Sequence, residues 1–298
     1  MSEELIRKLG QDRVKINEPL APHVYMKVGG PADFYFEAAN SQELAEAVKA
    51  AIEAGIPFIV IGAGANILVS DKGFRGLAIK NAAKTVKFLP FGFVEAESGV
   101  ENSVLITAAK NRGLSGMERL IKVPGTVGGA VLMNAGDTAK EEFFGDLVVS
   151  VEVIDKESRL KKLRAEGCEF GYRTSRFQTS GEIILKTKIQ LKQAGKEEIE
   201  AKAKDILVRK MRQPSGPTLG STFRNPPGQY AGKLIEEAGL KGRQIGGAKI
   251  SEKHANFIIN LGNATASDVK ALIDLMKSEV KKKFNVDLEE EIKYLGEW

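Results

Sequence analysis

The feature that most constrains the fold is an apolar, β-branched run at 56–61 that ends in a glycine-rich turn at 62–66. Runs of this kind are typical of a buried strand. The segment before it follows a polar cap at Asn40 or Ser41 and shows helical spacing of its apolar residues. Those residues are Leu44, Val48 and Ile52. With a first strand expected at 34–36, this part of the chain predicts a β-α-β unit.

The composition predicts a folded protein with a sizeable core. At 298 residues and 43% apolar content, the chain can form one large domain or two to three smaller ones. Its formal net charge of +5 fits an anionic substrate and is weak support for nucleic-acid binding. We therefore expect no nucleic-acid partner, and the sequence leaves protein partners open.

Cysteine and histidine are scarce. The single cysteine, Cys168, rules out a disulfide within the chain, suits a reducing cytoplasm and is expected to be a small buried hydrophobe. With only two histidines, we expect no metal site. The chain starts with polar residues and contains no run of about 18 apolar ones, so we expect a cytoplasmic protein without a membrane segment.

The remaining elements are predicted from periodicity and turn residues. Residues 1–20 indicate a short helix and a linker. Strands are predicted at 85–97 (a pair), 147–154, 182–191, 256–260 and 286–294. Helices are predicted at 101–112, 196–212, 229–238 and 267–283. The residues expected to face inward are Val104, Leu105 and Ala108 in the first of these helices, and Val269, Leu272, Ile273, Met276 and Val280 in the last. A stretch rich in Pro, Gly, Ser and Thr at 213–228 places a domain boundary near 200–213.

The turn at 62–66 matches a dinucleotide-binding fingerprint only in part. That fingerprint needs a third glycine where a helix opens, and an acid about 20 residues further on. Asn66 stands where the helix would open, and 81–84 offers no acid. A standard Rossmann site for NAD is therefore disfavoured, although glycines still let backbone N–H groups converge on a phosphate.

A second glycine-rich turn lies at 124–129 and is followed by Met133-Asn134-Ala135-Gly136. Two such turns, far apart in the chain, suit a long ligand held across two lobes. Taken alone, either turn is equally well explained as an ordinary tight turn between strands.

Three further segments concentrate reactive side chains around Arg173, Ser221 and Glu291. The segments are 171–175, 220–226 and 288–293. Each candidate also has an ordinary interpretation: a structural ion pair, a turn residue beside glycine, and a charge on a solvated strand face. If Leu288 and Ile292 face one side of a final strand, Glu291 shares the other side with its charged neighbours Glu289 and Lys293.

Together, these segments resemble the UDP-N-acetylenolpyruvoylglucosamine reductase family, whose members are flavin enzymes of bacterial cell-wall synthesis. The similarity covers most of the chain, and motifs in the family's order are far more specific than any one alone. They are Lys27-Val28-Gly29-Gly30-Pro31-Ala32, Gly62-Ala63-Gly64-Ala65-Asn66-Ile67-Leu68, Val123-Pro124-Gly125-Thr126-Val127-Gly128-Gly129, Met133-Asn134-Ala135-Gly136, Gly171-Tyr172-Arg173, Gly220-Ser221-Thr222-Phe223-Arg224-Asn225-Pro226, Leu240-Lys241-Gly242 and the C-terminal acidic strand.

The resemblance implies an α+β fold, with a two-lobed FAD-binding domain of the PCMH type and a smaller α/β substrate-binding domain. The implied bounds are 1–25 for an N-terminal helix and linker, 26–191 for the FAD-binding domain with lobes of about 26–80 and 81–191, and 192–298 for a linker helix and the C-terminal domain.

The resemblance also implies an activity, the NADPH-dependent and FAD-mediated reduction of UDP-N-acetylglucosamine enolpyruvate to UDP-N-acetylmuramate. Arg173, Ser221 and Glu291 match the family's catalytic residues. The residues expected to bind FAD are Gly62, Gly64, Asn66, Ile67, Leu68, Pro124, Gly125, Thr126, Gly128, Gly129, Asn134 and Ala135. Those expected to bind the UDP-sugar are Tyr172, Arg212, Asn225 and Lys241.

The chain departs from the family pattern in two places. Residues 137–142 replace a short Ala-Tyr-Gly-like turn, which leaves the flavin contacts of 137–145 open. Arg224 stands where lysine is usual. It keeps the positive charge, but its planar guanidinium replaces the compact ammonium group of lysine. The short spacing after Tyr172 resembles the subgroup that lacks an extra tyrosine-bearing loop.

Two other function classes remain open from the sequence. A different flavin oxidoreductase of the PCMH type, such as an oxidase, often holds its flavin through a covalent histidine. His23 and His254 are the candidates, and neither lies in a glycine-rich turn. Basic stretches at 207–212 and 281–283 could form a nucleic-acid patch, but a solvated helix face and a helix C-terminus explain them better.

Overall fold

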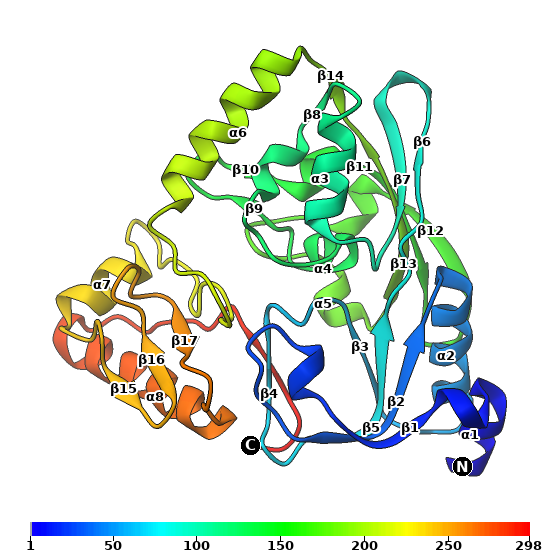
Figure 1. Ribbon diagram of the computed structural model, residues 1–298, viewed down its shortest axis with the longest axis horizontal. Coiled ribbons are helices and arrows are strands. Elements are labelled where there is room, and N and C mark those ends of the chain that lie inside the picture. The colour runs from blue at the N-terminus through cyan, green and yellow to red at the C-terminus, as the bar shows by residue number, and fades with distance from the viewer. Residues whose placement is uncertain (1) are drawn as a thin grey trace. The chain divides into compact units, whose positions relative to one another are not determined.

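The computed structural model describes residues 2–298, in which helices and strands are mixed along the chain (Figure 1). The helices are α1 (Ser2–Leu9), α2 (Ser41–Glu53), α3 (Asn102–Lys110), α4 (Val127–Leu132), α5 (Phe177–Ser180), α6 (Lys196–Lys210), α7 (Ala231–Glu237) and α8 (Ala266–Phe284). The strands are β1 (Lys15–Pro19), β2 (Pro31–Ala38), β3 (Phe58–Ile61), β4 (Ile67–Val69), β5 (Phe74–Asn81), β6 (Val86–Phe88), β7 (Phe93–Glu97), β8 (Leu114–Ser115), β9 (Gly136–Asp137), β10 (Glu142–Phe143), β11 (Val148–Ile154), β12 (Leu160–Arg164), β13 (Ile183–Gln190), β14 (Lys192–Gln193), β15 (Gln244–Ile245), β16 (Ala248–Ile250), β17 (Ile258–Asn260) and β18 (Lys293–Leu295). This mixture confirms the predicted α+β class.

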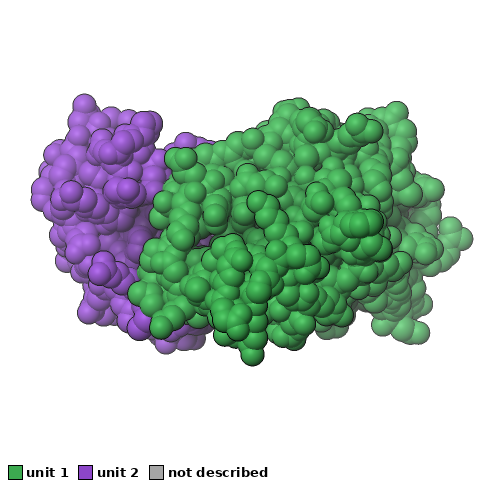
Figure 2. Space-filling model, turned by 90° about the horizontal axis from the view of Figure 1, so that it is seen from above, with its two compact units in different colours: residues 1–15, 34–63, 76–210 green, residues 16–33, 64–75, 211–298 purple. Residues whose placement is uncertain are grey.

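The chain forms two compact units, drawn in green and purple in Figure 2. The first unit consists of the described residues up to Lys15, 34–63 and 76–210, and the second of 16–33, 64–75 and 211–298. Each unit is assembled from separated stretches, whereas the sequence-based bounds of 26–191 and 192–298 are continuous. Those bounds stay a prediction, because a compact unit and a domain defined by its ligand need not coincide.

The ends of helix α2, in the first unit, are set by its own sequence. The side chain of Asn40 accepts a hydrogen bond from the N–H of Glu43 at 2.9 Å, as an N-cap does. After the helix, Gly55 adopts a φ of 62°, the left-handed conformation in which helices commonly end. The predicted apolar face is packed, since Leu44 and Val48 are buried and Ile52 lies against the same core.

The predicted β-α-β unit is confirmed. Its two strands, β2 and β3, belong to one sheet in the order β1-β2-β5-β3. Strand β5 lies between them and pairs with β3 in parallel, in a register that joins Phe58 to Leu77. Strand β5 is absent from the sequence-based prediction, because its continuous apolar run is only three residues long, at 77–79.

A five-stranded antiparallel sheet, in the order β12-β11-β13-β7-β6, forms the rest of the first unit's framework. Helix α3 contributes Leu105 and Ala109 to the core against it, and both are fully buried. Val104 is 53% exposed, so the prediction that it faces inward is wrong. At 3.6 residues per turn, the side chain of Val104 lies on the face opposite Asn102 and Ala109, which are buried.

Helix α8 organises the second unit. It begins with a capping box, in which Thr265 Oγ1 accepts from the N–H of Asp268 and the Asp268 carboxylate accepts from the N–H of Thr265. Its predicted apolar face is confirmed. The buried residues of that face are Val269, Leu272, Ile273, Met276 and Val280. They pack in one core with Phe223 and Ile258.

The final strand is shorter than predicted. The sequence predicts a strand at 286–294, but only β18 pairs as a strand, in parallel with β4. Leu288 and Ile292 are buried, as the alternation of apolar residues indicates. The intervening backbone bonds to 222–224 through separate contacts, which an alternating pattern cannot distinguish from a regular ladder.

Cys168 is fully buried, and burial raises the pKa of its thiol to about 11, which confirms that it is a buried small side chain. Across residues 2–298, no cluster of three or more His, Cys, Asp or Glu could hold a metal ion. No helix in the same range is both long and apolar enough to cross a membrane.

The carboxylate of Glu97, at the end of β7, joins three segments of the first unit. One oxygen accepts from the N–H of Ser41 and the other from the N–H of Thr85, both at 2.9 Å, and the residue is only 6% exposed. Burial acts to raise the pKa of Glu97, but these hydrogen bonds outweigh it, and the pKa is lowered. The carboxylate therefore stabilises the fold above the unfolded-state pKa of about 4.3, and that contribution is lost as the pH falls through the lower folded-state pKa.

Replacing Glu97 by glutamine should lower the free energy of unfolding by roughly 1.5–3 kcal/mol near pH 7, because one charged acceptor is lost. The deficit should shrink below about pH 4, where the wild-type carboxyl also becomes neutral. Urea unfolding at several pH values measures both effects, and Glu95→Gln on the same strand is the control. A deficit as large at about pH 3 as at neutrality would contradict this role of the charge.

Candidate functional site

Gly62 and Thr126, one residue from each glycine-rich turn, are neighbours within the first unit. Gly62 follows β3, and Thr126 is the N-cap of α4. A Cβ atom added to Gly62 would lie 2.5 Å from Thr126 Oγ1. The turn at 62–66 is followed by strand β4 and not by a helix, in agreement with the argument against a Rossmann site. Two residues that are separate in the sequence are therefore neighbours in space.

The second turn uses some of its backbone donors inside the protein. The N–H of Val127 donates to the carbonyl of Val100, and the N–H of Gly128 donates to that of Ser98, both at 2.8 Å. A Cβ at Gly128 would lie 2.8 Å from Ser98 Cβ. The N–H groups of these two residues are therefore engaged within the protein, and the glycine at 128 allows α4 to pack closely on Ser98.

Glycine is needed in these turns because a methyl group would strike the opposing segment. The Thr126 side chain thus packs directly on Gly62, and the Lys80 ammonium donates to the carbonyl of Gly62 at 2.5 Å. At Gly129 an added Cβ would meet only Thr126 Oγ1, at an ordinary 3.7 Å. Glycine-rich turns let backbone N–H groups come close to the phosphates of a cofactor. The residues present are therefore compatible with FAD.

Asn134 connects two loops around the candidate arginine. Its Nδ2 donates to the carbonyl of Gly171 and its Oδ1 accepts from the N–H of Gly145, both at 2.8 Å. The residue is buried and has a φ of 42°, a left-handed conformation that asparagine tolerates. Its side chain thus has a structural task, whether or not its backbone also contacts a cofactor.

Arg173 is held in an unusual backbone conformation. Its φ is 55°, which for a long side chain costs on the order of 1–3 kcal/mol. The loop that imposes it is closed by paired hydrogen bonds between Gly171 and Thr174. Gln178 Nε2 donates to the Arg173 carbonyl at 3.0 Å. Strain held by surrounding structure is typical of functional positions, and this supports the choice of Arg173.

The guanidinium of Arg173 rests on the segment at 136–143. Its Nη2 donates to the carbonyl of Gly136 at 3.1 Å and to Thr138 Oγ1 at 3.4 Å. Its Cζ lies 5.9 Å from the Phe143 ring centroid and 6.0 Å from that of Tyr172, and the two rings meet edge to face. Tyr172 is 39% exposed, so its ring also remains available to a ligand.

The second unit brings Ser221 and Glu291 close together through their backbones. Thr222, the residue after Ser221, accepts at its carbonyl the N–H of Glu291 at 2.9 Å. The carbonyl of Glu291 accepts in turn from Asn66 Nδ2 at 3.1 Å. Asn256 fixes the other edge of the segment, since its side chain bonds both the N–H and the carbonyl of Phe223.

The two acids before Glu291 form ion pairs within the second unit. Glu289 forms an ion pair with Arg224 at 3.0 Å, and its side chain is 70% exposed. Glu290 forms an ion pair with Lys277 on α8, also at 3.0 Å, and accepts from the Tyr294 hydroxyl at 3.4 Å. Glu289 and Glu290 are therefore each held in an ion pair within the second unit, and the assignment of Glu291 as the catalytic acid stays a prediction.

The residues predicted to bind substrate occupy different settings. Asn225 Oδ1 accepts from the N–H of Ala231 at the start of α7, at 3.1 Å. Lys241 forms an ion pair with Glu236 at 2.6 Å and is partly exposed. Arg212 is exposed. None of these contacts rules out ligand binding, and the assignments stay predictions.

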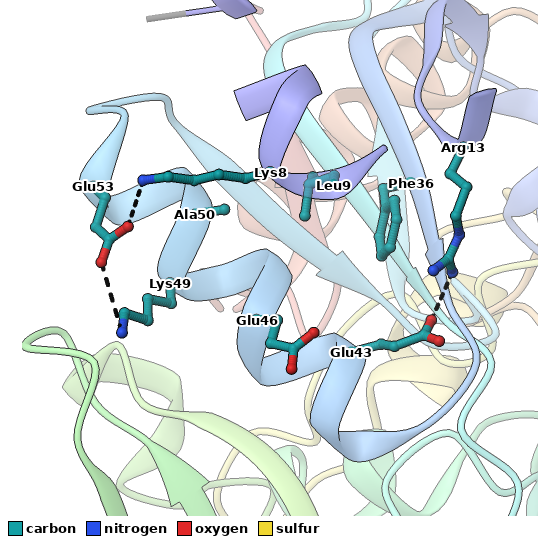
Figure 3. Close-up of a pocket in the computed structure, with 9 residues that line it drawn as sticks. All are labelled: Lys8, Leu9, Arg13, Phe36, Glu43, Glu46, Lys49, Ala50 and Glu53. Carbon is teal, nitrogen blue, oxygen red and sulfur yellow. Dashed lines mark hydrogen bonds and ion pairs between the residues drawn. The ribbon is translucent and has the colours of Figure 1, made fainter. Parts of the chain in front are cut away.

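A cavity of about 270 Å³ lies between α1 and α2 in the first unit (Figure 3). Its rim carries ion pairs of Lys8 with Glu53 and of Arg13 with Glu43, both at 2.6 Å. Lys49 approaches Glu53 at 3.8 Å on the same rim. None of the sequence-predicted site residues lines this cavity.

Sequence reasoning does not identify Asn256, Asp137 or Arg209, all of which anchor site segments. Asn256 stands at the start of a predicted strand, and nothing in its neighbours indicates that its side chain bonds another segment. Asp137 lies in the stretch that departs from the family pattern. Arg209 lies in the helix predicted at 196–212, which has the composition of a charged linker. Only long-range contacts reveal their tasks.

Comparison with known proteins gives matches to both halves of the chain. Residues 32–164 match a family model described as "FAD binding domain", and residues 211–295 match one described as "UDP-N-acetylenolpyruvoylglucosamine reductase, C-terminal domain". Proteins named UDP-N-acetylenolpyruvoylglucosamine reductase from Caldanaerobacter subterraneus and Carboxydothermus hydrogenoformans are 42% and 43% identical. The alignments cover 100% of this chain, and 100% and 98% of those proteins.

A solved structure shows the same likeness in three dimensions. The crystal structure of UDP-N-acetylenolpyruvylglucosamine reductase from Thermus caldophilus has a TM-score of 0.81 to this chain at 34% identity. The alignment covers 95% of this chain and 98% of that structure.

Replacing Gly62 by alanine should push the two glycine-rich turns apart, because the added Cβ would lie 2.5 Å from Thr126 Oγ1. Overpacking costs roughly 1–3 kcal/mol, which corresponds to about 5- to 150-fold weaker FAD binding if the cost falls on the bound state. Gly167→Ala is the control, since its Cβ would meet Leu163 only at 4.0 Å. Flavin absorbance per protein after gel filtration measures the effect, and full flavin retention in Gly62→Ala would refute it.

Proposed function

Because the chain belongs to the UDP-N-acetylenolpyruvoylglucosamine reductase family, we propose that it reduces UDP-N-acetylglucosamine enolpyruvate to UDP-N-acetylmuramate. FAD is the cofactor and NADPH the reductant, and the product serves peptidoglycan synthesis. The observation that carries this proposal is similarity over the whole chain to proteins of that name, at 42% identity. The match at 32–164 to a FAD-binding domain supports the cofactor independently.

When bound, FAD would supply the hydride-transfer chemistry between NADPH and the methylene carbon of the enolpyruvyl group. The protein supplies orientation, charge and a proton for the rest of the reaction. Gly62 and the turn from Pro124 to Gly129 are the residues that would hold the cofactor through their backbone. Asn66, Ile67 and Leu68 are proposed as further contacts to it.

Arg173 binds the substrate carboxylate. Hydride addition leaves negative charge on the carbon next to this carboxylate. The planar guanidinium can donate hydrogen bonds to the carboxylate and stabilise the charge that develops beside it. Electrostatic stabilisation of developing charge is often the largest catalytic contribution. The strained backbone and the hydrogen bond to the carbonyl of Gly136 hold the guanidinium in one orientation before substrate binds.

Ser221 donates a proton to the same carbon. The hydroxyl is a weak acid, but the carbanion it meets is a strong base, so position matters more than acidity. Gly220, with a φ of 73°, turns the chain immediately before it, and the bonds of Asn256 fix the segment immediately after it. The serine then recovers its proton from solvent.

Glu291 assists as a neutral acid or by polarising a water molecule. A carboxyl beside a bound substrate carboxylate should have a raised pKa, because two like charges disfavour ionisation. The hydrogen bond from its N–H to the carbonyl of Thr222 fixes its backbone next to that of Ser221. Tyr172, Arg212, Asn225 and Lys241 bind the uridine diphosphate and sugar of the substrate.

Three observations bear on the remaining alternatives and on location. His23 and His254, the residues that could carry a covalent flavin, both lie outside 32–164, which disfavours an oxidase of that type. Several cations of the basic stretches have partners within the protein: Arg209 pairs with Asp137, and Lys281 with Asp287. The single buried cysteine suits a cytoplasmic location, which is part of this proposal.

The purified protein should show the visible absorption bands of bound flavin. NADPH should bleach them without oxygen, and UDP-N-acetylglucosamine enolpyruvate should restore them, because the two half-reactions share one carrier. Anaerobic spectroscopy measures both steps. A colourless protein that cannot be loaded with FAD would exclude the proposed activity.

Replacing Ser221 by alanine should separate the two half-reactions. NADPH should still bleach the flavin at a nearly normal rate, whereas product formation should fall by about 10²- to 10⁴-fold, the range for loss of a proton donor. Ser215→Ala, an exposed serine in the same segment, is the control. Stopped-flow absorbance follows each step, and near-normal product formation in Ser221→Ala would remove the serine from the mechanism.

A further inference from the structure

Strands β9 and β10 form a hairpin at 136–143 that lies beside α6 (Figure 1). The hairpin receives the guanidinium of Arg173 on the carbonyl of Gly136 and the hydroxyl of Thr138. The ring of Phe143, on its second strand, faces the same guanidinium. The position of the arginine fork therefore depends on where this hairpin lies.

The hairpin is attached to α6 mainly through Asp137. This residue is 6% exposed, and its Oδ2 lies 2.6 Å from Nη1 of Arg209. Its other oxygen accepts from the N–H of Ala139 at 3.1 Å, which closes the turn. A second ion pair joins Lys140 to Asp205 at 2.7 Å, but both side chains are about half exposed. Exposed pairs contribute little, whereas breaking a buried pair is costly, so Asp137 carries most of the attachment.

The charges around Arg173 give Asp137 a second effect. The pKa of Lys210 is lowered to about 8, chiefly by burial; Asp137 opposes this shift, and the charges of Arg173 and Arg209 add to it. Asp137 is thus an anion among three basic side chains that repel one another. Removing its charge would leave Arg173 repelled by Arg209 and Lys210 and less firmly seated on the hairpin.

We propose that the Asp137–Arg209 ion pair is a positioning element for Arg173: it fixes the 136–143 hairpin on α6 and so orients the guanidinium toward the substrate carboxylate. This inference rests on the proposed function, because it acts through the role assigned to Arg173. Neither residue is required to touch substrate or cofactor. The chain thereby uses the segment that departs from its family's pattern to support the arginine.

The test is a double-mutant cycle of Asp137→Asn with Arg173→Ala. Asparagine retains an acceptor for the N–H of Ala139 and removes only the charge paired with Arg209. The matched control is Lys140→Met, which breaks the exposed pair between the same hairpin and the same helix. For each variant, the measurements are flavin bleaching by NADPH, reoxidation by the enolpyruvyl substrate, substrate affinity from the flavin spectrum, and melting temperature.

Asp137→Asn should slow reoxidation by roughly 10- to 100-fold, as expected for a displaced catalytic group, while bleaching and flavin content stay normal. In the Arg173→Ala background, the same substitution should change the rate by no more than about twofold, since a residue acting through Arg173 has no further effect once it is gone. Lys140→Met should match the wild type in every measurement.

Equal losses in both backgrounds would overturn the proposal, because they would mean that Asp137 acts independently of Arg173. A wild-type rate in Asp137→Asn, with Arg173→Ala impaired, would also overturn it while leaving the proposed function intact. If Arg173→Ala itself retained full activity, the proposed role of the arginine would fail instead. Should Asp137→Asn not fold, Arg209→Gln removes the other half of the pair at a partly exposed position and gives the same cycle.

Discussion

The first unit depends on two adjacent residues at the end of β7, Glu97 and Ser98. The Glu97 carboxylate accepts the N–H groups of Ser41 at the start of α2 and of Thr85 before β6. Ser98 accepts from Asn81 at its hydroxyl and from Gly128 at its carbonyl, and its N–H donates to Leu185. Both side chains are buried, so each of these polar groups must be satisfied within the protein. This junction places the second glycine-rich turn against the end of the sheet.

In the second unit, a comparable set of backbone bonds surrounds Glu291. Thr222 accepts its N–H, Asn66 donates to its carbonyl, and Asn256 fixes the neighbouring segment from the opposite edge. Such bonds determine the position of a side chain more firmly than loop packing does, since each one fixes a main-chain atom. Ser221 and Glu291 are therefore presented by rigid backbone, although neither belongs to a regular helix or strand.

Much of the fold could be predicted, because periodicity reports which side of an element is buried. The buried faces of α2 and α8 follow directly from residue spacing, as Leu44 and Leu272 illustrate. The same reasoning failed for Val104, because a short helix offers too few turns to define its face. It also missed β5, and it extended the last strand through residues whose backbone bonds individually to another segment. For the two strands, a partner far away in the sequence decided the outcome.

The sequence by itself determined the family, the glycine positions and the candidate residues, because these depend on residue identity and order. It could not show that Glu289 pairs with Arg224 and that Glu290 pairs with Lys277 on α8. Nor could it reveal that Asp137, on the hairpin that bonds Arg173, forms an ion pair with Arg209. Hydrogen bonds and ion pairs depend on distances between segments that local spacing does not encode. Only the tertiary structure fixed those distances, and with them the setting of Arg173.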